Sequence, residues 1–337
     1  MDRRLFLRRL LALTAGLCAA GPSRASSWGS RGPAQDAVPA GDGAVPGAQS
    51  LPRRALGSTG VDLPVLALGG FHVGLAAQRD GEPAARALIE TALDEGIRFF
   101  DTAESYQGGA SERLLGEVLA DARDEVFLMT KTHAPKSRDV ESARRHLEGS
   151  LERLRTDHLD LWQLHSVKSP EDVDRSFADE SGAMAYLREA KATGLTRFIG
   201  VTGHVQPEAQ LRAVHHHGEG QGFDTMQMPI NPIDFHQHSF QLQALPRVVE
   251  AGIGLIAMKT SAAGALLQEG VTTIEQNLRF VLSLPVSAMV VGMETAEQVR
   301  QNAAIVRDQG PLDEAEAEAL LERIASRAEL SLEWYKS

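Results

Sequence analysis

The sequence predicts an α/β protein with a single main domain, a closed (β/α)8 barrel of the TIM type. Short apolar runs of strand character alternate with amphipathic stretches of helical period, which is typical of a parallel sheet. The runs recur every 32 residues or so, about the length of one strand–helix unit. The chain has no G-x-G-x-x-G motif of the kind that marks the switch point of an open doubly wound sheet. Closure into a barrel is therefore favoured.

The first 50 residues have the character of a leader and a linker. Paired arginines at positions 3–4 and 8–9 precede an apolar run over 10–20, and Ser23-Arg24-Ala25 offers small residues for cleavage. This run is too short for a permanent membrane anchor, and the pattern is typical of a twin-arginine export signal over residues 1–25. A generic secretory signal and a disordered basic tail are the alternatives. Residues 26–50, rich in Gly, Ala and Pro, predict a flexible linker.

This leader predicts a periplasmic protein that reaches its compartment through the export machinery, or a cytoplasmic one if the leader is not used. The single cysteine, Cys18, lies in the leader, so a mature chain would have no thiol chemistry. Removing residues 1–25 takes away five arginines and one aspartate and changes the net charge from −11 to −15. An acidic chain without a basic stripe argues against binding to nucleic acid or to anionic membranes.

Residues 51–337 are predicted to form the barrel. A short hairpin over 54–62, centred on Gly57-Ser58-Thr59-Gly60, precedes the first strand. Eight strands are predicted: Pro64–Gly70, Arg98–Ala103, Val126–Thr132, Leu159–His165, Thr196–Gly203, Thr225–Ile230, Gly254–Thr260 and Ser287–Met293. Helical stretches between them include Glu82–Glu95, Ser111–Arg123, Val140–Arg155, Ala183–Ala192 and Glu297–Arg307. An extra C-terminal helix, Leu312–Leu330, is expected to pack on the outside.

Four polar side chains stand at or just after the ends of three predicted strands. They are Asp101, Tyr106, Lys131 and His165. Because parallel barrel strands all end at one face, a carboxylate, a phenol, an ammonium and an imidazole are expected to meet there. Each has a structural alternative, as a loop ion pair, a surface phenol, a solvated strand end or a core histidine. Their common spacing favours one proton-transfer site.

These residues belong to motifs through which the chain resembles the aldo-keto reductases, from about residue 52 to residue 310. The matching segments occur in the family's order and at barrel spacing. They are Ala55–Gly60, Phe100–Tyr106, Thr130–Thr132, Leu159–His165, Ile199–Gly203, Gln227–Asn231 and Val290–Gln298. The resemblance implies reduction of an aldehyde or ketone with a hydride from NADPH or NADH, since no side chain supplies a hydride.

The chemistry of the four residues suits that reaction. A free tyrosine, with a pKa of about 10, is a slow general acid at neutral pH. An ammonium at Lys131 is expected to lower the pKa of Tyr106 towards the working range, while Asp101 holds and neutralises the lysine. His165 is expected to donate to the substrate oxygen and to stabilise the charge that develops there.

The resemblance also implies cofactor contacts at the ends of the later strands. Polar contacts to the nicotinamide carboxamide are expected from Thr202, Gly203 and Gln227. Met258 would cover the nicotinamide ring, and Lys259 would meet the pyrophosphate. The adenosine end would lie against Gly292, Glu294, Gln298 and Asn302. No cation stands at the first three of these positions, so we expect a weakened preference for the 2′-phosphate of NADPH.

Other residues have weaker assignments. The substrate pocket is expected to be lined by Phe71, His72 and the segment Asn231–His238. Lys168 could favour a substrate that carries an acid group, although a solvated loop lysine is the commoner role. The run His215–His217 and the pair His236 and His238 lack metal-ligand spacing, so no metal site is expected. Two rival functions remain open: a non-catalytic dinucleotide-binding accessory or redox-sensing subunit, and a cofactor-free lyase using Lys131 as a Schiff base. The sequence does not indicate an oligomeric state or the identity of the carbonyl substrate.

Overall fold

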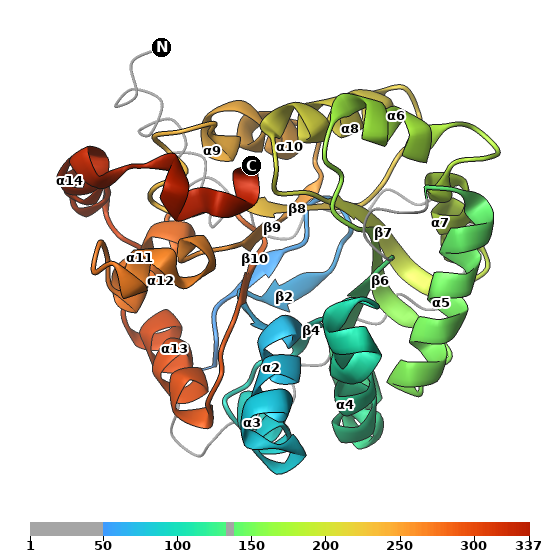
Figure 1. Cartoon of the computed structure of the whole chain (residues 1–337), viewed down its shortest axis with the longest axis horizontal. Helices are drawn as coiled ribbons and strands as arrows, with labels where there is room; N and C mark the ends of the chain where they lie inside the picture. The colour runs from blue at the N-terminus through green and yellow to red at the C-terminus, as the bar shows by residue number, and fades with distance from the viewer. Residues whose placement is uncertain (1–49, 133–137) are drawn as a thin grey trace.

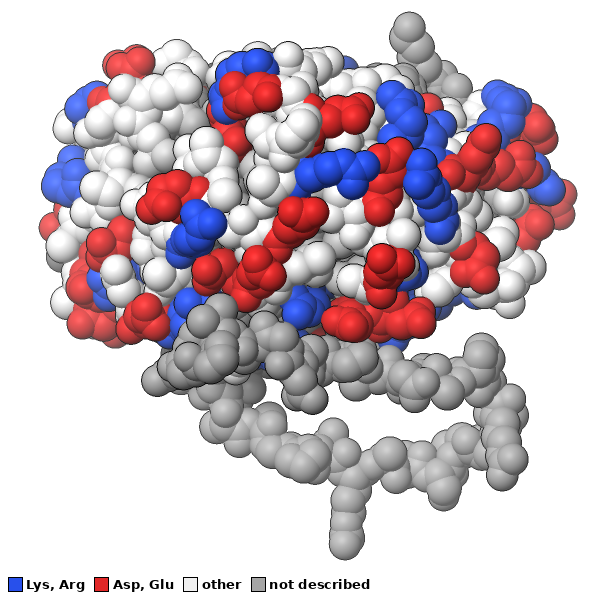
Figure 2. Space-filling view, turned by 90° about the horizontal axis from the view of Figure 1, so that it is seen from below, with Lys and Arg blue, Asp and Glu red and all other residues white. Residues whose placement is uncertain are grey.

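The computed structural model describes residues 50–132 and 138–337. The predicted leader over 1–25, with Cys18, and all but the last residue of the predicted linker lie outside the described residues. Within the two described ranges, no helix is long and apolar enough to cross a bilayer. Figure 2 shows acidic and basic side chains interspersed on one face of the molecule, so this face has no charge of a single sign.

Eight parallel strands close into one barrel at the centre of the molecule, ringed by helices (Figure 1). They follow one another in chain order, and the last pairs with the first. The strands are β3 (Leu66–Gly69), β4 (Phe99–Asp101), β5 (Phe127–Lys131), β6 (Leu159–Leu164), β7 (Thr196–Thr202), β8 (Thr225–Pro229), β9 (Gly254–Met258) and β10 (Ala288–Val291). Each lies inside its predicted range, so the predicted barrel is confirmed.

Helices cover the outside of the barrel. They are α2 (Gly70–Asp80), α3 (Glu82–Asp94), α4 (Ala110–Val118), α5 (Val140–Leu154), α6 (Pro170–Phe177), α7 (Ala183–Ala192), α8 (Pro207–Gly218), α9 (Phe240–Gln243), α10 (Leu245–Glu250), α11 (Ala265–Gln268), α12 (Ile274–Leu282), α13 (Ala296–Asp308) and α14 (Glu314–Ile324). The starts of α5, α6, α9, α12, α13 and α14 are capped by the side chain of the preceding residue. Thr273, for example, forms a reciprocal capping box with Gln276 at the start of α12.

Strand side chains alternate between two cores, as the two-residue period of a strand requires. On β6, Leu161 belongs to the cluster inside the barrel, whereas its neighbour Trp162 belongs to the layer between strands and helices. The Trp162 ring meets the ring of Tyr186 on α7 edge-on, with centroids 6.0 Å apart. Inside the barrel, the Phe127 ring packs edge-on against Phe99 at 5.0 Å. The interior is therefore a packed core rather than a channel.

The predicted N-terminal hairpin is present as β1 (Arg53–Ala55) and β2 (Asp62–Pro64), which pair antiparallel. Leu56 and Leu63 of this hairpin are fully buried in the interior cluster, so the hairpin forms part of the core inside the barrel. The guanidinium of Arg54 donates to the backbone oxygens of Leu282, Leu284 and Val286, at 2.5–3.0 Å. These bonds tie the hairpin to the segment that leads into β10.

Two predicted elements differ from the structure. The helix predicted over Leu312–Leu330 ends at Ile324, and the segment Leu330–Lys336 forms a 3-10 turn instead. It leaves the helical path because Tyr335 and Lys336 find buried polar partners on the loop after β8. In addition, α2 begins directly at the end of β3, and this helix was not among the predicted helical stretches. A Cβ at Gly70 would approach the Asp101 backbone oxygen to 2.4 Å, so this tight transition requires glycine.

The hairpin turn provides a test of this packing. Gly57 has φ +54°, and a Cβ there would lie 2.3 Å from the Gly254 amide nitrogen. Gly60 also has a positive φ, +78°, but a Cβ there would meet no atom within 4 Å. We therefore expect Gly60→Ala to lower the free energy of unfolding by about 1 kcal/mol, through backbone strain alone. Gly57→Ala should cost about 1–3 kcal/mol more, because it also overpacks the core.

Denaturant unfolding of both variants measures the difference. Equal losses for Gly57→Ala and Gly60→Ala would contradict the close packing of this hairpin against the segment that enters β9.

Candidate active site

The structure brings the four predicted residues together at the C-terminal mouth of the barrel. Asp101 ends β4, Lys131 ends β5, and His165 directly follows β6. Tyr106 begins a short 3-10 turn, Tyr106–Gly109, in the loop after β4. Each residue is placed by a strand end or by the first turn after it, which is where barrel enzymes hold their reacting groups.

The Lys131 ammonium is the centre of this group. It forms an ion pair with Asp101, donates to the Thr102 backbone oxygen at 2.7 Å, and lies 3.5 Å from the Tyr106 hydroxyl oxygen. Lys131 and Asp101 are 1% and 3% exposed. A buried charge of this kind is held only when it is paired and hydrogen-bonded, and here both conditions are met.

Burial and neighbouring charges determine the protonation states of Lys131 and Tyr106. Burial alone would lower the pKa of Lys131, but Asp101 and then Tyr106 outweigh it, so the pKa is raised and the amine stays charged. For Tyr106, burial raises the pKa by more than Lys131 lowers it, and Asp101 adds to the rise. The expected net lowering of the Tyr106 pKa is therefore wrong, although the ammonium acts in the predicted direction. Tyr106 is a protonated phenol at neutral pH.

His165 faces Tyr106, and their ring centroids are 6.0 Å apart with the planes nearly perpendicular. Burial lowers its pKa well below the ordinary value, and the nearby positive charge of Lys131 adds to this effect. The imidazole is therefore neutral and presents one N–H donor. Its Nδ1 is buried without a hydrogen-bond partner among the residues that the structure describes. An oxygen between Tyr106 and His165 would have two donors available.

The residues expected to contact the nicotinamide carboxamide are also adjacent. Thr202 on β7 is the register partner of Gln227 on β8, and the Gly203 amide donates to the Gln227 backbone oxygen at 3.2 Å. The side-chain oxygen Oε1 of Gln227 is buried and has no partner within the described ranges. A Cβ at Gly203 would approach the Val167 backbone oxygen to 2.6 Å. An orphaned acceptor beside a glycine suits a bound amide group.

Met258 and Lys259 lie at the end of β9. Met258 is its last residue, and Lys259 follows in the left-handed conformation with φ +55°. Burial and then the charge of Lys131 lower the pKa of Lys259. Its ammonium lies 5.6 Å from the centroid of the Tyr335 ring and makes no hydrogen bond or ion pair to the residues described. A partly buried cation without an anion is suited to a phosphate group.

The four residues expected near the adenosine follow β10. Gln298 is used locally: its side-chain oxygen accepts from the Glu294 amide at 2.7 Å at the start of α13. Asn302 is buried on α13, and Gly292 lies against the His72 ring, which a Cβ there would approach to 2.2 Å. These residues share one strand end and one helix, and within the described part of the chain no hydrogen bond or ion pair joins them to the four catalytic candidates.

Arg79 is a residue that the sequence analysis missed. It lies in the last turn of α2 and forms an ion pair with Glu294. The sequence held no signal for it, because α2 itself was not predicted and the two residues are 215 positions apart. The missing cation near Glu294 is therefore supplied from another element, although the carboxylate offsets its charge.

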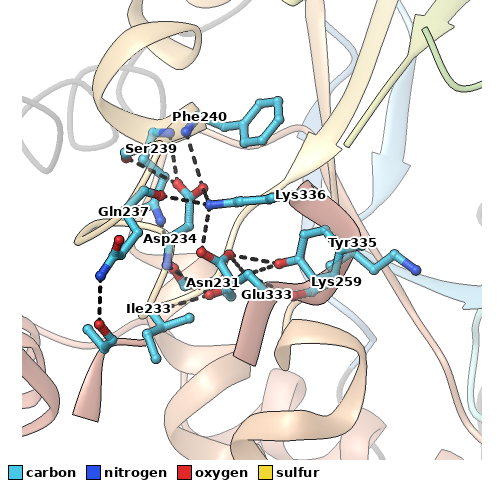
Figure 3. A network of polar contacts seen from close by, with 12 residues as sticks. Asn231, Ile233, Asp234, Gln237, Ser239, Phe240, Lys259, Glu333, Tyr335 and Lys336 are labelled. Carbon is cyan, nitrogen blue, oxygen red and sulfur yellow. Dashed lines mark hydrogen bonds and ion pairs between the residues drawn. The ribbon is translucent and has the colours of Figure 1, made fainter. Parts of the chain in front are cut away.

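The C-terminal segment, Leu330–Lys336, was also missed. Figure 3 shows the buried network that anchors it. The Lys336 ammonium lies between Asp234 and Glu333, 2.6 Å from an oxygen of each, and donates to the Gln237 backbone oxygen at 2.9 Å. These three charged side chains are at most 1% exposed. Part of the segment Asn231–His238, expected to line the substrate pocket, instead anchors the C-terminus.

This anchor continues to Lys259. The Asn231 side-chain amide donates to the Lys259 backbone oxygen at 3.2 Å and lies 3.1 Å from the Tyr335 hydroxyl. The Tyr335 backbone oxygen in turn lies 3.1 Å from Nδ1 of His204, whose Nε2 is 3.3 Å from the Ser166 hydroxyl. The last residues of the chain therefore border the same mouth as the catalytic candidates.

The histidine run shows no metal-binding arrangement. His216 on α8 lies 2.7 Å from a carboxylate oxygen of Asp174 and stacks on Phe177 with centroids 4.7 Å apart. Among the described residues, no group of three or more His, Cys, Asp or Glu side chains is placed to hold a metal ion.

The Lys336 network gives a stability prediction. Lys336→Met leaves the Asp234 and Glu333 carboxylates buried without their cation, so we expect the free energy of unfolding to fall by about 3–5 kcal/mol. Lys191→Met is the control, because it removes a lysine from the surface pair with Asp224, whose side chains are 40% and 18% exposed. That change should cost less than about 1 kcal/mol. Denaturant unfolding of the two variants compares them, and equal losses would contradict the anchoring role.

Comparison with known proteins supports the resemblance seen in the motifs. The model of the aldo/keto reductase family matches residues 65–277. L-galactose dehydrogenase from Arabidopsis thaliana is 27% identical over 307 residues, which are 78% of this chain and 93% of that protein. An uncharacterised oxidoreductase from Bacillus subtilis is 30% identical over 237 residues, 63% of this chain and 67% of that protein.

Solved structures share the barrel. An aldo-keto reductase from Bacillus halodurans in its holo form superposes with a TM-score of 0.68 at 21% identity, over 81% of this chain and 96% of the other. An aldo-keto reductase from Klebsiella pneumoniae in complex with NADPH gives a TM-score of 0.64 at 20% identity, over 80% and 94%. At these identities the superpositions establish the fold. The family match spans most of the barrel, so this chain belongs to the aldo/keto reductase family and is an oxidoreductase with a nicotinamide cosubstrate.

Proposed function

We propose that this protein reduces an aldehyde or ketone to an alcohol with Tyr106 as the general acid. The observation that carries the proposal is the buried Lys131 ammonium, paired with Asp101 and 3.5 Å from the Tyr106 hydroxyl. The reduced nicotinamide supplies the hydride when it is bound. The residues of this chain supply the proton and the electrostatic environment.

The catalytic step follows from the protonation states. The Tyr106 phenol and one N–H of His165 donate hydrogen bonds to the carbonyl oxygen and polarise it. As negative charge develops on that oxygen, Tyr106 transfers its proton and becomes a phenolate. Lys131 stabilises the phenolate because its ammonium stays charged. Asp101 keeps that ammonium in place, and solvent returns the proton to Tyr106 after the alcohol leaves.

The residues that would hold the dinucleotide lie at or near the ends of the consecutive strands β7 to β10 and at the start of α13. Gln227, with its unpartnered acceptor, would receive the carboxamide, and Met258 would cover the nicotinamide ring. The Lys259 ammonium, which makes no ion pair to the residues described, would meet the pyrophosphate. The adenosine end would lie at the start of α13, near the pair of Arg79 and Glu294.

The geometry disfavours the Schiff-base alternative. A Schiff base forms from a neutral amine, whereas the pKa of Lys131 is raised by Asp101 and Tyr106. The accessory-subunit alternative requires no proton donor, and the assembled set of Asp101, Tyr106, Lys131 and His165 argues against it.

A matched pair of tyrosine variants tests the general acid. Tyr106→Phe removes the proton donor and keeps the ring, so we expect kcat to fall by about 10²–10⁴-fold with dinucleotide affinity unchanged. Tyr186→Phe is the control, because that tyrosine packs on Trp162 between β6 and α7, away from the mouth. The measurement is nicotinamide absorbance with a panel of aldehydes and ketones, on the full chain. Turnover retained within threefold in Tyr106→Phe would overturn the assignment.

The residues expected to contact the adenosine end of the dinucleotide predict the cofactor preference. Because Glu294 offsets the charge of Arg79, its arginine partner within the described ranges, we expect NADH and NADPH to bind within tenfold of each other. Quenching of tryptophan fluorescence by each dinucleotide measures this. Glu294→Gln removes one of the two carboxylates beside Arg79, which keeps its pair with Asp80. This change should shift the preference towards NADPH, since guanidinium groups bind phosphate well. Binding of NADPH more than tenfold tighter than NADH by the unaltered chain would contradict the expectation.

A further inference from the structure

Strand β6, which leads to His165, is held at both ends by an arginine. At the mouth, the guanidinium of Arg138 donates to the His165 backbone oxygen at 2.7 Å and to the Ser166 backbone oxygen at 3.0 Å. These bonds hold the backbone of the histidine itself and of the residue after it. Ser166 has φ +52°, a left-handed conformation that is strained for a non-glycine residue. The turn that places His165 therefore depends on external contacts.

Arg138 is itself rigidly placed. Its Nε and Nη2 donate to the two carboxylate oxygens of Asp172 on α6, at 3.0 and 2.8 Å, the two-pronged geometry that suits guanidinium. Its backbone oxygen accepts from the Ala183 amide at 2.8 Å at the start of α7. Arg138 and Asp172 are 8% and 4% exposed. Arg138 thus connects two helices to the backbone of His165, α6 through its guanidinium and α7 through its backbone oxygen.

The opposite end of β6 carries the same kind of contact without any catalytic group. Arg123 donates to the His158 backbone oxygen and to the Asp160 carboxylate, each at 2.9 Å. This end is the N-terminal face of the barrel, where buried contacts serve stability. Each aspartate also keeps a second arginine: Arg175 lies 3.0 Å from Asp172, and Arg197 lies 2.7 Å from Asp160. The two contacts form a natural matched pair.

We propose that Arg138 is a positioning residue for His165: through the backbone oxygens of His165 and Ser166, it sets the placement of the imidazole that faces Tyr106. This inference rests on the proposed function, in which His165 donates to the substrate oxygen. A displacement of about 1 Å at such a donor costs on the order of 10²-fold in rate. Arg138 touches no reacting atom, so its effect appears in the catalytic step and not in dinucleotide binding.

The test compares Arg138→Met with Arg123→Met in the full chain. Each substitution removes a guanidinium that contacts one end of β6. Asp172 keeps Arg175 in the first variant, and Asp160 keeps Arg197 in the second. For Arg138→Met we expect kcat to fall at least tenfold, with the Kd of the dinucleotide changed less than twofold. For Arg123→Met we expect a lower melting temperature and a kcat within twofold of the unaltered chain. A similar kcat loss in both variants, or none in Arg138→Met, would overturn the proposal.

If Arg138→Met does not fold, two more conservative variants test the same proposal. Arg138→Lys keeps the charge but loses the two-pronged geometry, and Asp172→Asn keeps the shape but weakens the hold on Arg138. Both should lower kcat by several-fold with an unchanged Kd. Normal kcat in both folded variants would overturn the proposal.

A readout that needs no turnover separates this proposal from the proposed function. In histidine-labelled protein, the His165 NMR signal is identified by its loss in His165→Gln. Arg138→Met should shift or broaden that signal, whereas Arg123→Met should leave it in place. An unchanged His165 signal in Arg138→Met would overturn the positioning role. If the unaltered chain reduced no carbonyl in the panel but the signal moved, the proposed function would fail while the positioning role stood.

Discussion

The ion pair between Lys131 and Asp101 is the interaction on which the rest of the site depends. Its members end adjacent strands: Asp101 on β4 is the register partner of Met129 on β5, and Lys131 lies two residues further along on the same side of the sheet. Almost complete burial requires that both stay paired, because a lone charge there would be unfavourable by several kcal/mol. The same burial keeps Tyr106 protonated and His165 neutral. One constraint therefore sets the protonation states of all four groups.

The barrel and the catalytic set were predictable because they depend on local patterns. Each strand is a short apolar run, and each catalytic residue follows such a run or its first turn. Asp101, Lys131 and His165 needed only the strand order to be brought together. The direction in which the pKa of Tyr106 is shifted was not predictable. Burial raises this pKa and Lys131 lowers it, and the extent of burial depends on the packing of the whole mouth. The leader over residues 1–25 remains a prediction from the sequence.

The parts that escaped prediction are contacts between residues far apart in the chain. Lys336 and Asp234 are 102 positions apart, and nothing in the last residues indicated that an ammonium would be buried. Arg79 reaches Glu294 from a helix with no clear apolar stripe in the sequence. In the sequence, Arg138 is a polar residue in a loop, but in the folded chain its guanidinium donates to the His165 backbone oxygen. Contacts between residues far apart in the chain hold the site in place, whereas the reacting groups are recognised in the sequence because they follow apolar strand segments.

Three sets of contacts lie around the C-terminal mouth of the barrel. They are the Lys336 network, the contact of Arg138 with His165 and the ion pair of Lys131 with Asp101. Hydride transfer is tested by whether deuterium from a dinucleotide deuterated at both C4 positions of the nicotinamide reaches the product. The full chain is incubated with this reduced cofactor in ordinary water and with a carbonyl compound, and the alcohol is analysed by mass spectrometry. We expect one deuterium on the former carbonyl carbon and none on the oxygen, which takes its proton from Tyr106. A product without deuterium, accompanied by trapping of Lys131 by borohydride, would contradict hydride transfer and favour Schiff-base chemistry.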